Sequence, residues 1–315
     1  MSRPIAVVTG VSGQDGSLAA ELLLGRGYRV LGLGRTSPTV LDGVEFIHGD
    51  VADAGRVEEI LKVHRPDEFY NFAALTSGAG MFDSPSRMGE VNGLAVTHIL
   101  EAIRQFSPHT RFCQASSSEM FGDVSSSPQS ETTPLRPRSP YGAAKVYAHS
   151  MIRIYRERYE LFACSAILYN HESARRRIEF VTRKITDGAA RIKLGVAKEL
   201  ELGNLDARRD WGSAVDYVRA MHMMLAHKYP DDYVVATGVL HSVRDVCTVA
   251  FGHLGLDYRE YVREVVDRSR APESIPLVGD AARLRGLGWQ PQVSFEAMIV
   301  SMVDADVVEH MKSLN

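Results

Sequence analysis

The sequence predicts an α/β fold, a doubly wound parallel sheet followed by a smaller C-terminal α/β lobe. Three observations support this prediction. Residues 5–10 form a short apolar strand that ends in glycine and leads through a glycine-spaced turn into a helix-forming run. Strand-like and helical runs then alternate up to residue 168, as in parallel strands joined by helical crossovers. After residue 168 the composition becomes arginine-rich, which marks the lobe.

The composition excludes several classes of protein. The 315 residues are 45% hydrophobic and 24% charged, as in an ordinary globular chain with a sizeable core. A net charge of −3 gives no reason to expect a nucleic-acid partner, and no apolar run approaches the roughly 20 residues of a membrane span. The three cysteines are widely spaced and are expected to be reduced and buried. We therefore expect a cytoplasmic protein with no membrane partner and no metal site.

Residues 10–16 form the first candidate binding site. Gly10, Gly13 and Gly16 open a helix whose free N–H groups and dipole can hold a pyrophosphate, and Gln14 and Asp15 lie in the same turn. The glycine spacing alone is weak evidence. Strand, turn, helix and a second strand at 28–33 together are the context that a dinucleotide site of the Rossmann type requires.

The end of the second strand predicts which dinucleotide binds. An acidic residue there would bind the ribose 2′-hydroxyl of NAD, whereas this strand is followed by Arg35, Thr36 and Ser37. A guanidinium with two hydroxyls suits the 2′-phosphate of NADP. We therefore expect NADP rather than NAD, although an exposed loop arginine is also common.

The next two strands, at 44–50 and 67–74, extend the predicted cofactor site. Asp50 and Val51 fall where the adenine edge would lie. Ala73 and Ala74 end the later strand, and their small side chains either let a cofactor pass closely or simply pack tightly. A polar, glycine-bearing run at 75–86 follows as a candidate substrate loop, before a long helix at 90–106.

A tyrosine and a lysine are candidate catalytic residues. Tyr141 and Lys145 lie four apart in a helix-forming run that Ser139 caps and Pro140 begins, so both share one helix face. An ammonium one turn away favours the phenolate, so the pair can take and return a proton on an alcohol. A single YxxxK pattern also arises by chance in many helices, and the surrounding chain must support it.

A serine and a carboxylate lie at the end of a preceding strand. Ser117 and Glu119 follow the apolar run 111–116 at its carboxyl end, where ligands bind in open α/β sheets. A carboxylate beside the Tyr141 and Lys145 pair indicates a second proton transfer.

The lobe begins with a strongly basic segment. Six cationic or imidazole side chains fall within residues 171–184, and Arg208 and Arg209 repeat the pattern. Such a run is by default a solvated face. Beside a dinucleotide fold, contact with the phosphates of a nucleotide-linked substrate is at least as well supported. Trp289 is expected to be a packing residue.

Several segments together resemble a known family closely. They are TGVSGQDGS, QASSSEMFG, RPRSPYGAAK, FACSAILYNHES, FVTRKITDGAARIKLG, LGNLDARRDWG and YVVATGVLHSVRD. They are similar to GDP-mannose 4,6-dehydratases, members of the extended short-chain dehydrogenase/reductase superfamily. The resemblance covers nearly the whole chain. It implies an NADP-binding Rossmann domain at 1–168 and 210–240, and a nucleotide-sugar-binding lobe at 169–209 and 241–315.

The resemblance implies a role for each matching residue. Tyr141 would deprotonate the sugar O4, Lys145 would hold the cofactor ribose, Glu119 would remove the C5 proton, and Ser117, in place of the usual threonine, would polarise O4. His171 and Arg176 match cofactor contacts. The residues that match contacts to the nucleotide-sugar substrate are Asn170, Val181, Lys184, Gly203, Asn204, Arg209, Arg270 and Glu273, together with Thr76 and Ser77 in the substrate loop.

The chain departs from the family pattern in places that affect partners. The loop after Arg35 is shorter than the family's, so we expect a homodimer rather than a tetramer. Leu75, Thr76 and Ser77 replace Gln-Ser-His, and His241 replaces a tyrosine. A related GDP-hexose or GDP-heptose therefore stays open beside GDP-mannose. A UDP-glucuronate decarboxylase, a 4-epimerase and a non-catalytic NADP-binding protein are the alternatives in function.

Overall fold

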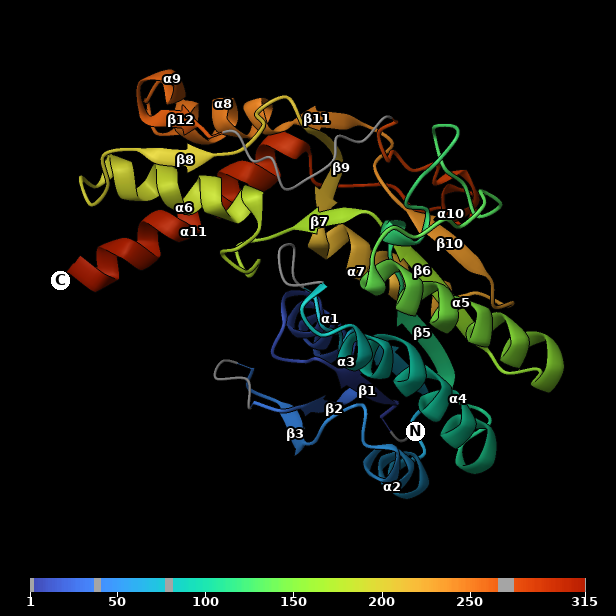
Figure 1. Ribbon diagram of the computed structural model, residues 1–315. Coiled ribbons are helices and arrows are strands. Elements are labelled where there is room, and N and C mark those ends of the chain that lie inside the picture. Colours follow the sequence, from blue (N-terminus) through green and yellow to red (C-terminus); the bar gives the residue numbers. More distant parts are fainter. Residues whose placement is uncertain (1–2, 37–40, 77–81, 266–274, 315) are drawn as a thin grey trace.

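The computed structural model describes residues 3–36, 41–76, 82–265 and 275–314. Its centre is a parallel sheet, which within these ranges has seven strands in the order β10-β6-β5-β4-β1-β2-β3 (Figure 1). The strands are β1 (Ile5–Thr9), β2 (Arg29–Gly34), β3 (Val44–His48), β4 (Glu68–Asn71), β5 (Arg111–Ala115), β6 (Ala163–Leu168) and β10 (Asp232–Val235). The order reverses at β1, so a crevice is expected at the carboxyl ends of β1 and β4.

Helices cover both faces of this sheet. One face buries apolar side chains of α1 (Gln14–Gly25) and α7 (Ala214–Ala226). The other buries those of α2 (Ala54–His64), α4 (Ala95–Phe106) and α5 (Pro140–Tyr159). The strands read as continuous apolar runs because they are buried on both faces. The predicted doubly wound α/β fold is confirmed.

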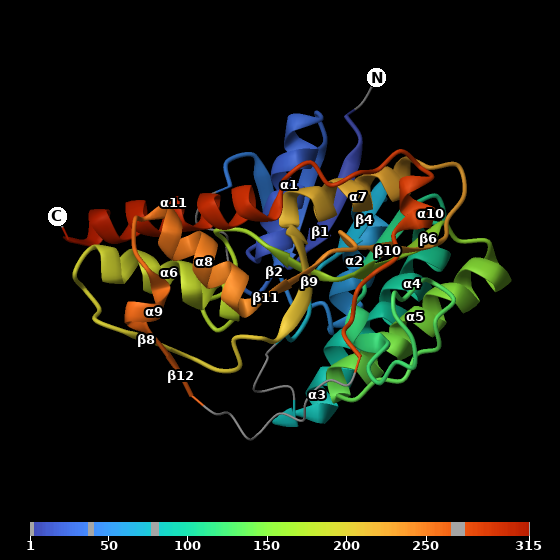
Figure 2. The ribbon, with the colours of Figure 1, turned by 90° about the horizontal axis from the view of Figure 1, so that it is seen from above.

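The lobe packs against the carboxyl-end side of the sheet (Figures 1 and 2). Among the described residues it contains a small sheet in the order β11-β9-β7 and a pair β12-β8. Its strands are β7 (Asn170–Glu172), β8 (Leu200–Leu202), β9 (Arg208–Ser213), β11 (Leu240–Ser242) and β12 (Val262–Glu264). The helices are α6 (Val181–Lys193), α8 (Val243–His253), α9 (Tyr258–Tyr261) and α11 (Phe295–Leu314), which bury a separate apolar core, and α10 (Ala282–Arg285) returns to β10.

At one of the crossings between the large sheet and the lobe, a single residue joins the two. β6 ends at Leu168 and β7 begins at Asn170, so only Tyr169 lies between them. Tyr169 is buried, its N–H donates to the Val235 carbonyl at 3.0 Å, and its hydroxyl donates to Gln129 Oε1 at 2.9 Å. The junction is therefore fixed on both its main-chain and side-chain sides.

The helical segment around residues 90–106 differs from the single helix predicted there. The structure begins the run at α3 (Pro85–Gly89) and widens it into a π-helical turn over Glu90–Leu94 before α4. Buried Asn92 lies in this turn, donates to the Leu75 carbonyl at 3.0 Å and accepts from the Leu75 N–H at 2.9 Å. The distortion thus goes with a clamp on the loop that follows β4, a contact that the helical pattern of the sequence does not indicate.

The expectations about the cysteines and Trp289 are confirmed. Cys113, Cys164 and Cys247 are free and buried, and Trp289 is fully buried with its indole N–H on the Asp216 carbonyl at 3.0 Å. Within the described ranges, every helix is too short or too polar to span a bilayer. Those same residues contain no group of three histidine, cysteine or acidic side chains arranged for a metal ion.

Candidate active site

The glycine turn lies between β1 and α1. Gly10 has φ +65° and donates its N–H to the Leu33 carbonyl, and a Cβ on Gly10 would lie 3.0 Å from the Ala73 nitrogen. A Cβ on Gly16 would overlap the Gly10 carbonyl oxygen, and exposed Gly13 is the N-cap of α1. Backbone N–H groups at a helix start, with no side chain over them, form a cradle that fits a diphosphate. The residues present therefore fit a dinucleotide.

An ion pair links α1 to the lobe beside this cradle. His171 on β7 places Nε2 2.9 Å from Asp15 Oδ2 and Nδ1 2.7 Å from the Tyr169 carbonyl. Both ring nitrogens thus face acceptors, which only a doubly protonated imidazole satisfies. Burial lowers the pKa of His171, but the Asp15 carboxylate outweighs burial and raises it. Burial raises the pKa of Asp15, but the His171 charge outweighs burial and lowers it. The geometry and the direction of both pKa shifts therefore favour the charged forms of His171 and Asp15.

The catalytic candidates of β5 and α5 meet where the strand ends. Ser117 caps a short 3₁₀ turn over Ser118–Met120 by accepting from the Glu119 N–H at 3.2 Å, and its side chain lies near enough to Tyr141 to lower the pKa of that phenol. The Glu119 main chain packs on α5, where a Cβ on Gly142 would lie 2.6 Å from the Glu119 carbonyl oxygen. Glu119 is exposed, and its charge acts on Tyr141. The structure therefore brings Ser117, Glu119 and Tyr141 together.

Helix α5 begins as predicted. Ser139 accepts from the Gly142 N–H at 3.1 Å as N-cap, and Pro140 occupies the first turn. Lys145 is buried one turn after Tyr141, with Nζ donating to the Ala115 carbonyl at 2.7 Å and lying 5.6 Å from the Tyr141 ring centroid. Burial lowers the pKa of Lys145 to about 8.

The pKa of Tyr141 moves opposite to the expected direction. Burial raises it to about 12, with further upward contributions from the Glu119 and Asp15 charges. The Ser117 side chain and the Arg176 charge lower it. Lys145 is not among the groups that shift this pKa, and its ammonium donates to the Ala115 carbonyl. The groups that favour the phenolate here are Ser117 and Arg176.

The basic segment at 171–184 is mostly paired with carboxylates. Arg175 contacts Glu21 of α1 at 2.5 Å and the Ser17 hydroxyl at 2.9 Å, and Ser173 donates to Gln14 Oε1 at 2.9 Å. Arg177 pairs with Glu179, and Arg183 with buried Asp306 of α11. Three of its six basic side chains, His171, Arg175 and Arg183, therefore fasten the lobe to α1 and α11, so the run is not a freely solvated face.

The chain matches one protein family over nearly its whole length. The profile of the family described as GDP-mannose 4,6 dehydratase matches residues 7–302. GDP-mannose 4,6 dehydratase 2 of Arabidopsis thaliana is 45% identical over 97% of this chain and 87% of its own length. The chain belongs to the GDP-mannose 4,6-dehydratase family. The predicted family is thereby confirmed, and with it the predicted activity of a nucleotide-sugar dehydratase, a lyase.

Solved structures agree on the fold. The UDP-glucose 4-epimerase of Thermus thermophilus, complexed with NAD, is 27% identical with a TM-score of 0.85, covering 96% of this chain and 98% of that one. RMD of Pseudomonas aeruginosa, complexed with NADPH, is 21% identical with a TM-score of 0.84, covering 98% and 100%. Nicotinamide dinucleotides are thus bound by relatives of this architecture.

The remaining residues predicted to bind the cofactor lie along the carboxyl edge of the sheet. Arg35 and Thr36 are exposed after β2, while Val51 is buried after β3. Asp50 pairs with Arg87 of α3 at 2.5 Å. Ala73 and Ala74 are partly buried, and the Ala73 N–H donates to the Thr9 hydroxyl at 3.0 Å. Arg87 and Asn92 were not predicted from the sequence, because their contacts to Asp50 and Leu75 join segments that are distant in the chain.

The substrate residues implied by the family lie on the lobe and on the loop after β4. Asn170 begins β7, Val181 begins α6, and Lys184 is exposed one turn further along. Thr76, Gly203 and Asn204 are exposed, and Arg209 on β9 is partly buried. Ser77, Arg270 and Glu273 lie outside the described residues, so their placement stays a prediction.

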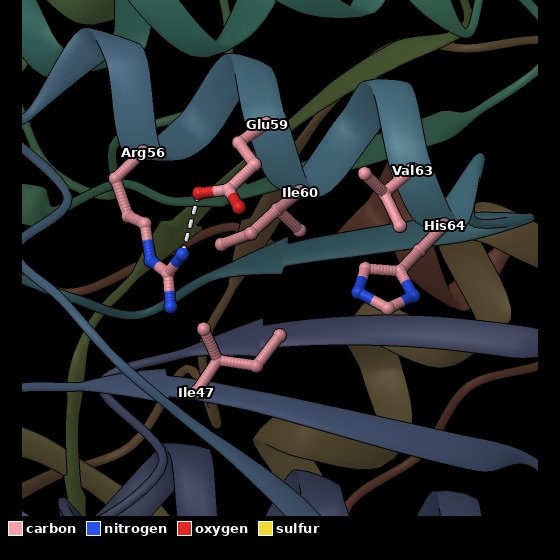
Figure 3. Close-up of a pocket in the computed structure, with 6 residues that line it drawn as sticks. All are labelled: Ile47, Arg56, Glu59, Ile60, Val63 and His64. Carbon is pink, nitrogen blue, oxygen red and sulfur yellow. Dashed lines mark hydrogen bonds and ion pairs between the residues drawn. The ribbon is translucent and has the colours of Figure 1, made fainter.

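A surface pocket lies away from these groups. Figure 3 shows it between β3 and α2, where the Arg56 guanidinium turns toward Glu59 in an ion pair of 2.5 Å. Its other lining residues are Ile47, Ile60, Val63 and His64. It contains none of the predicted site residues, so it does not bear on the dehydratase site.

Proposed function

We propose that this chain acts on GDP-mannose, or a close GDP-hexose or GDP-heptose, and converts it to the 4-keto-6-deoxy sugar with NADP bound throughout. The observation that supports this most is the position of Ser117 and Glu119 beside Tyr141, where both side chains act on the pKa of the phenol, in a chain of this family. In this assignment residues 1–168 and 210–240 bind the cofactor. Residues 169–209 and 241–315 bind the nucleotide-sugar.

The chain's own residues supply the proton transfers. Tyr141 takes the proton of the sugar O4 as C4 becomes a ketone, and Ser117 donates a hydrogen bond to that oxygen. The ketone acidifies C5–H, and Glu119 takes that proton and passes it to the departing C6 hydroxyl, which leaves as water. The proton that Tyr141 took from O4 balances the proton added back at C5 when C6 receives the hydride. When bound, the nicotinamide accepts the C4 hydride and returns it to C6. The sum is loss of one water with no net oxidation.

The pKa values decide how Tyr141 can work as a base. A phenol with a pKa of about 12 is almost wholly protonated near neutral pH, so little of the basic phenolate is present. The Ser117 side chain and the Arg176 charge oppose that rise in pKa, so they are the groups that make proton removal feasible. Lys145, with a pKa of about 8, supplies a hydrogen-bond donor to a cofactor ribose hydroxyl and a route for the proton.

NADP is preferred in this proposal because Arg35 and Thr36 follow β2, where NAD sites carry a carboxylate. Among the other proposed properties, the chain forms a homodimer through α5 and works without nucleic acid. Three buried, free thiols suit a reducing compartment, so the cytoplasm is the proposed location.

The test is product analysis with a base-site variant. GDP-mannose incubated with the NADP-loaded protein should give a 6-deoxy-4-keto sugar by NMR. Glu119→Gln should still oxidise C4, seen as a transient rise in nicotinamide absorbance, but should lose dehydration. Normal turnover by Glu119→Gln would show that another group removes the C5 proton. A pentose or an epimer as product would instead identify a decarboxylase or 4-epimerase, and no conversion of any nucleotide-sugar would favour a binding protein.

A further inference from the structure

Three contacts hold Arg176 in place. Its guanidinium stacks on the Phe180 ring, with Cζ 3.6 Å from the centroid. Its Nε lies 3.2 Å from Glu172 Oε2 in an ion pair that lacks hydrogen-bond geometry. Its carbonyl accepts from Arg183 Nη1 at 3.2 Å. The side chain, only 17% exposed, therefore has little freedom to reorient.

The far end of this side chain is uncommitted. Among the described residues, the terminal guanidinium nitrogens of Arg176 have no hydrogen-bond partner, whereas Arg175 and Arg183 place theirs on Glu21 and Asp306. The Arg176 charge nevertheless acts on Tyr141, Asp15 and His171, so it faces the active site. A guanidinium anchored at Nε with free terminal donors is arranged to bind an anion.

Glu172 is the unexpected member of this arrangement. Its carboxylate is 1% exposed at the end of β7, and it accepts from the buried Thr182 hydroxyl of α6 at 2.7 Å. Burying a carboxylate costs several kcal/mol, and its negative charge opposes the binding of any anion at Arg176. A purely Coulombic role would thus work against phosphate binding. Orientation of the guanidinium accounts for its presence.

We propose that Glu172, fixed by Thr182, is a positioning residue that aims the Arg176 terminal nitrogens at a phosphate of a bound nucleotide. The phosphate belongs either to the dinucleotide cofactor or to the nucleotide-sugar, and in this respect the inference rests on the proposed function. Phe180 completes the socket by supporting the face of the guanidinium.

Glu172→Gln tests the proposal. If Glu172 orients Arg176, the substitution weakens phosphate binding, whereas if its negative charge only opposes the phosphate, the substitution strengthens binding. Glutamine keeps the shape and an acceptor for Thr182 but loses the charge that holds Arg176. NADPH binding is followed by nicotinamide fluorescence, and GDP binding to NADP-loaded protein by calorimetry. We expect about tenfold weaker binding of whichever ligand Arg176 contacts, the size seen when a partner orienting a ligating side chain is removed. Unchanged or tighter binding of both ligands overturns the proposal.

A second pair of variants covers a folding failure of Glu172→Gln. Thr182→Val removes the donor to Glu172 and should weaken the same ligand, whereas Thr182→Ser keeps the hydroxyl and should restore binding. Equal affinity of the Val and Ser variants would contradict the assigned role of Glu172.

Asp216 provides a matched control. It is also 1% exposed and pairs with an arginine, Arg219, at 3.2 Å, but on α7 and outside the site. Asp216→Asn should lower the melting temperature without changing either affinity. If it weakens binding as much as Glu172→Gln does, the effect is one of stability and the proposal fails. Wild-type protein that binds NADPH yet converts no GDP-sugar would refute the proposed function instead, and would leave this comparison intact.

Discussion

Replacing Gly142 with alanine should separate the two proton-transfer groups. An alanine Cβ at this position would lie 2.6 Å from the Glu119 carbonyl oxygen and 3.0 Å from Pro137 Cβ. Ordinary contact begins at 3.4 Å, so the Glu119 main chain must retreat by about 3.4 − 2.6 = 0.8 Å. Overpacking of this kind costs about 1–3 kcal/mol of stability. A misplacement near 1 Å at a reacting group costs about 100-fold in rate.

We therefore expect Gly142→Ala to lower kcat for dehydration by about tenfold to 100-fold. NADPH affinity should change little, since the substitution lies on the Glu119 side of Tyr141. The assay is GDP-mannose turnover with NADPH titration and thermal melting in parallel. Gly252→Ala is the control, because that exposed glycine of α8 has nothing within 4 Å of the added Cβ. A Gly142→Ala enzyme with lowered stability but wild-type kcat would refute the dependence on the Glu119 position.

Three further variants test the cofactor side of the site. In urea unfolding, Asp15→Asn should destabilise the protein more at about pH 6 than at about pH 9. Burial lowers the pKa of His171, but the Asp15 carboxylate outweighs burial and raises this pKa above 6.5. The stability that the ion pair contributes is therefore fully present below pH 6.5 and is lost as the pH rises through the folded-state pKa of His171. An equal loss at both pH values would contradict a charged His171. Arg35→Asp should reverse the preference for NADP over NAD in kcat/KM, and an unchanged preference would remove Arg35 from the 2′-phosphate site. Gly16→Ala should abolish NADPH binding measured by fluorescence, because its Cβ overlaps the Gly10 carbonyl; retained affinity would show that the cradle can shift.

Sequence reasoning succeeded where the signal is local. The start of α5 could be predicted because Ser139, Pro140 and the apolar spacing of the helix all act within one or two turns. The glycine turn was predictable for the same reason, since Gly10 and Gly16 are required by contacts within the turn itself.

The partners of the basic segment could not be predicted, because they lie far along the chain. Arg183 pairs with Asp306, 123 positions away, and Arg175 with Glu21, 154 positions away. Likewise the raised pKa of Tyr141 depends on burial by segments that meet only in the folded protein. Local spacing correctly placed Lys145 one helical turn from Tyr141, but it could not show that the Lys145 ammonium donates a hydrogen bond to the Ala115 carbonyl.

The single-residue junction at Tyr169 limits how the two parts of the enzyme can move. A hinge needs a few residues whose backbone angles can change, and Tyr169 is tied by its N–H, its hydroxyl and its burial. His171 follows two residues later, so its distance to Asp15 is set by a stiff connection. We therefore expect substrate exchange to depend on local motion of the loops beside Tyr141, with the large sheet and the start of β7 moving as one body.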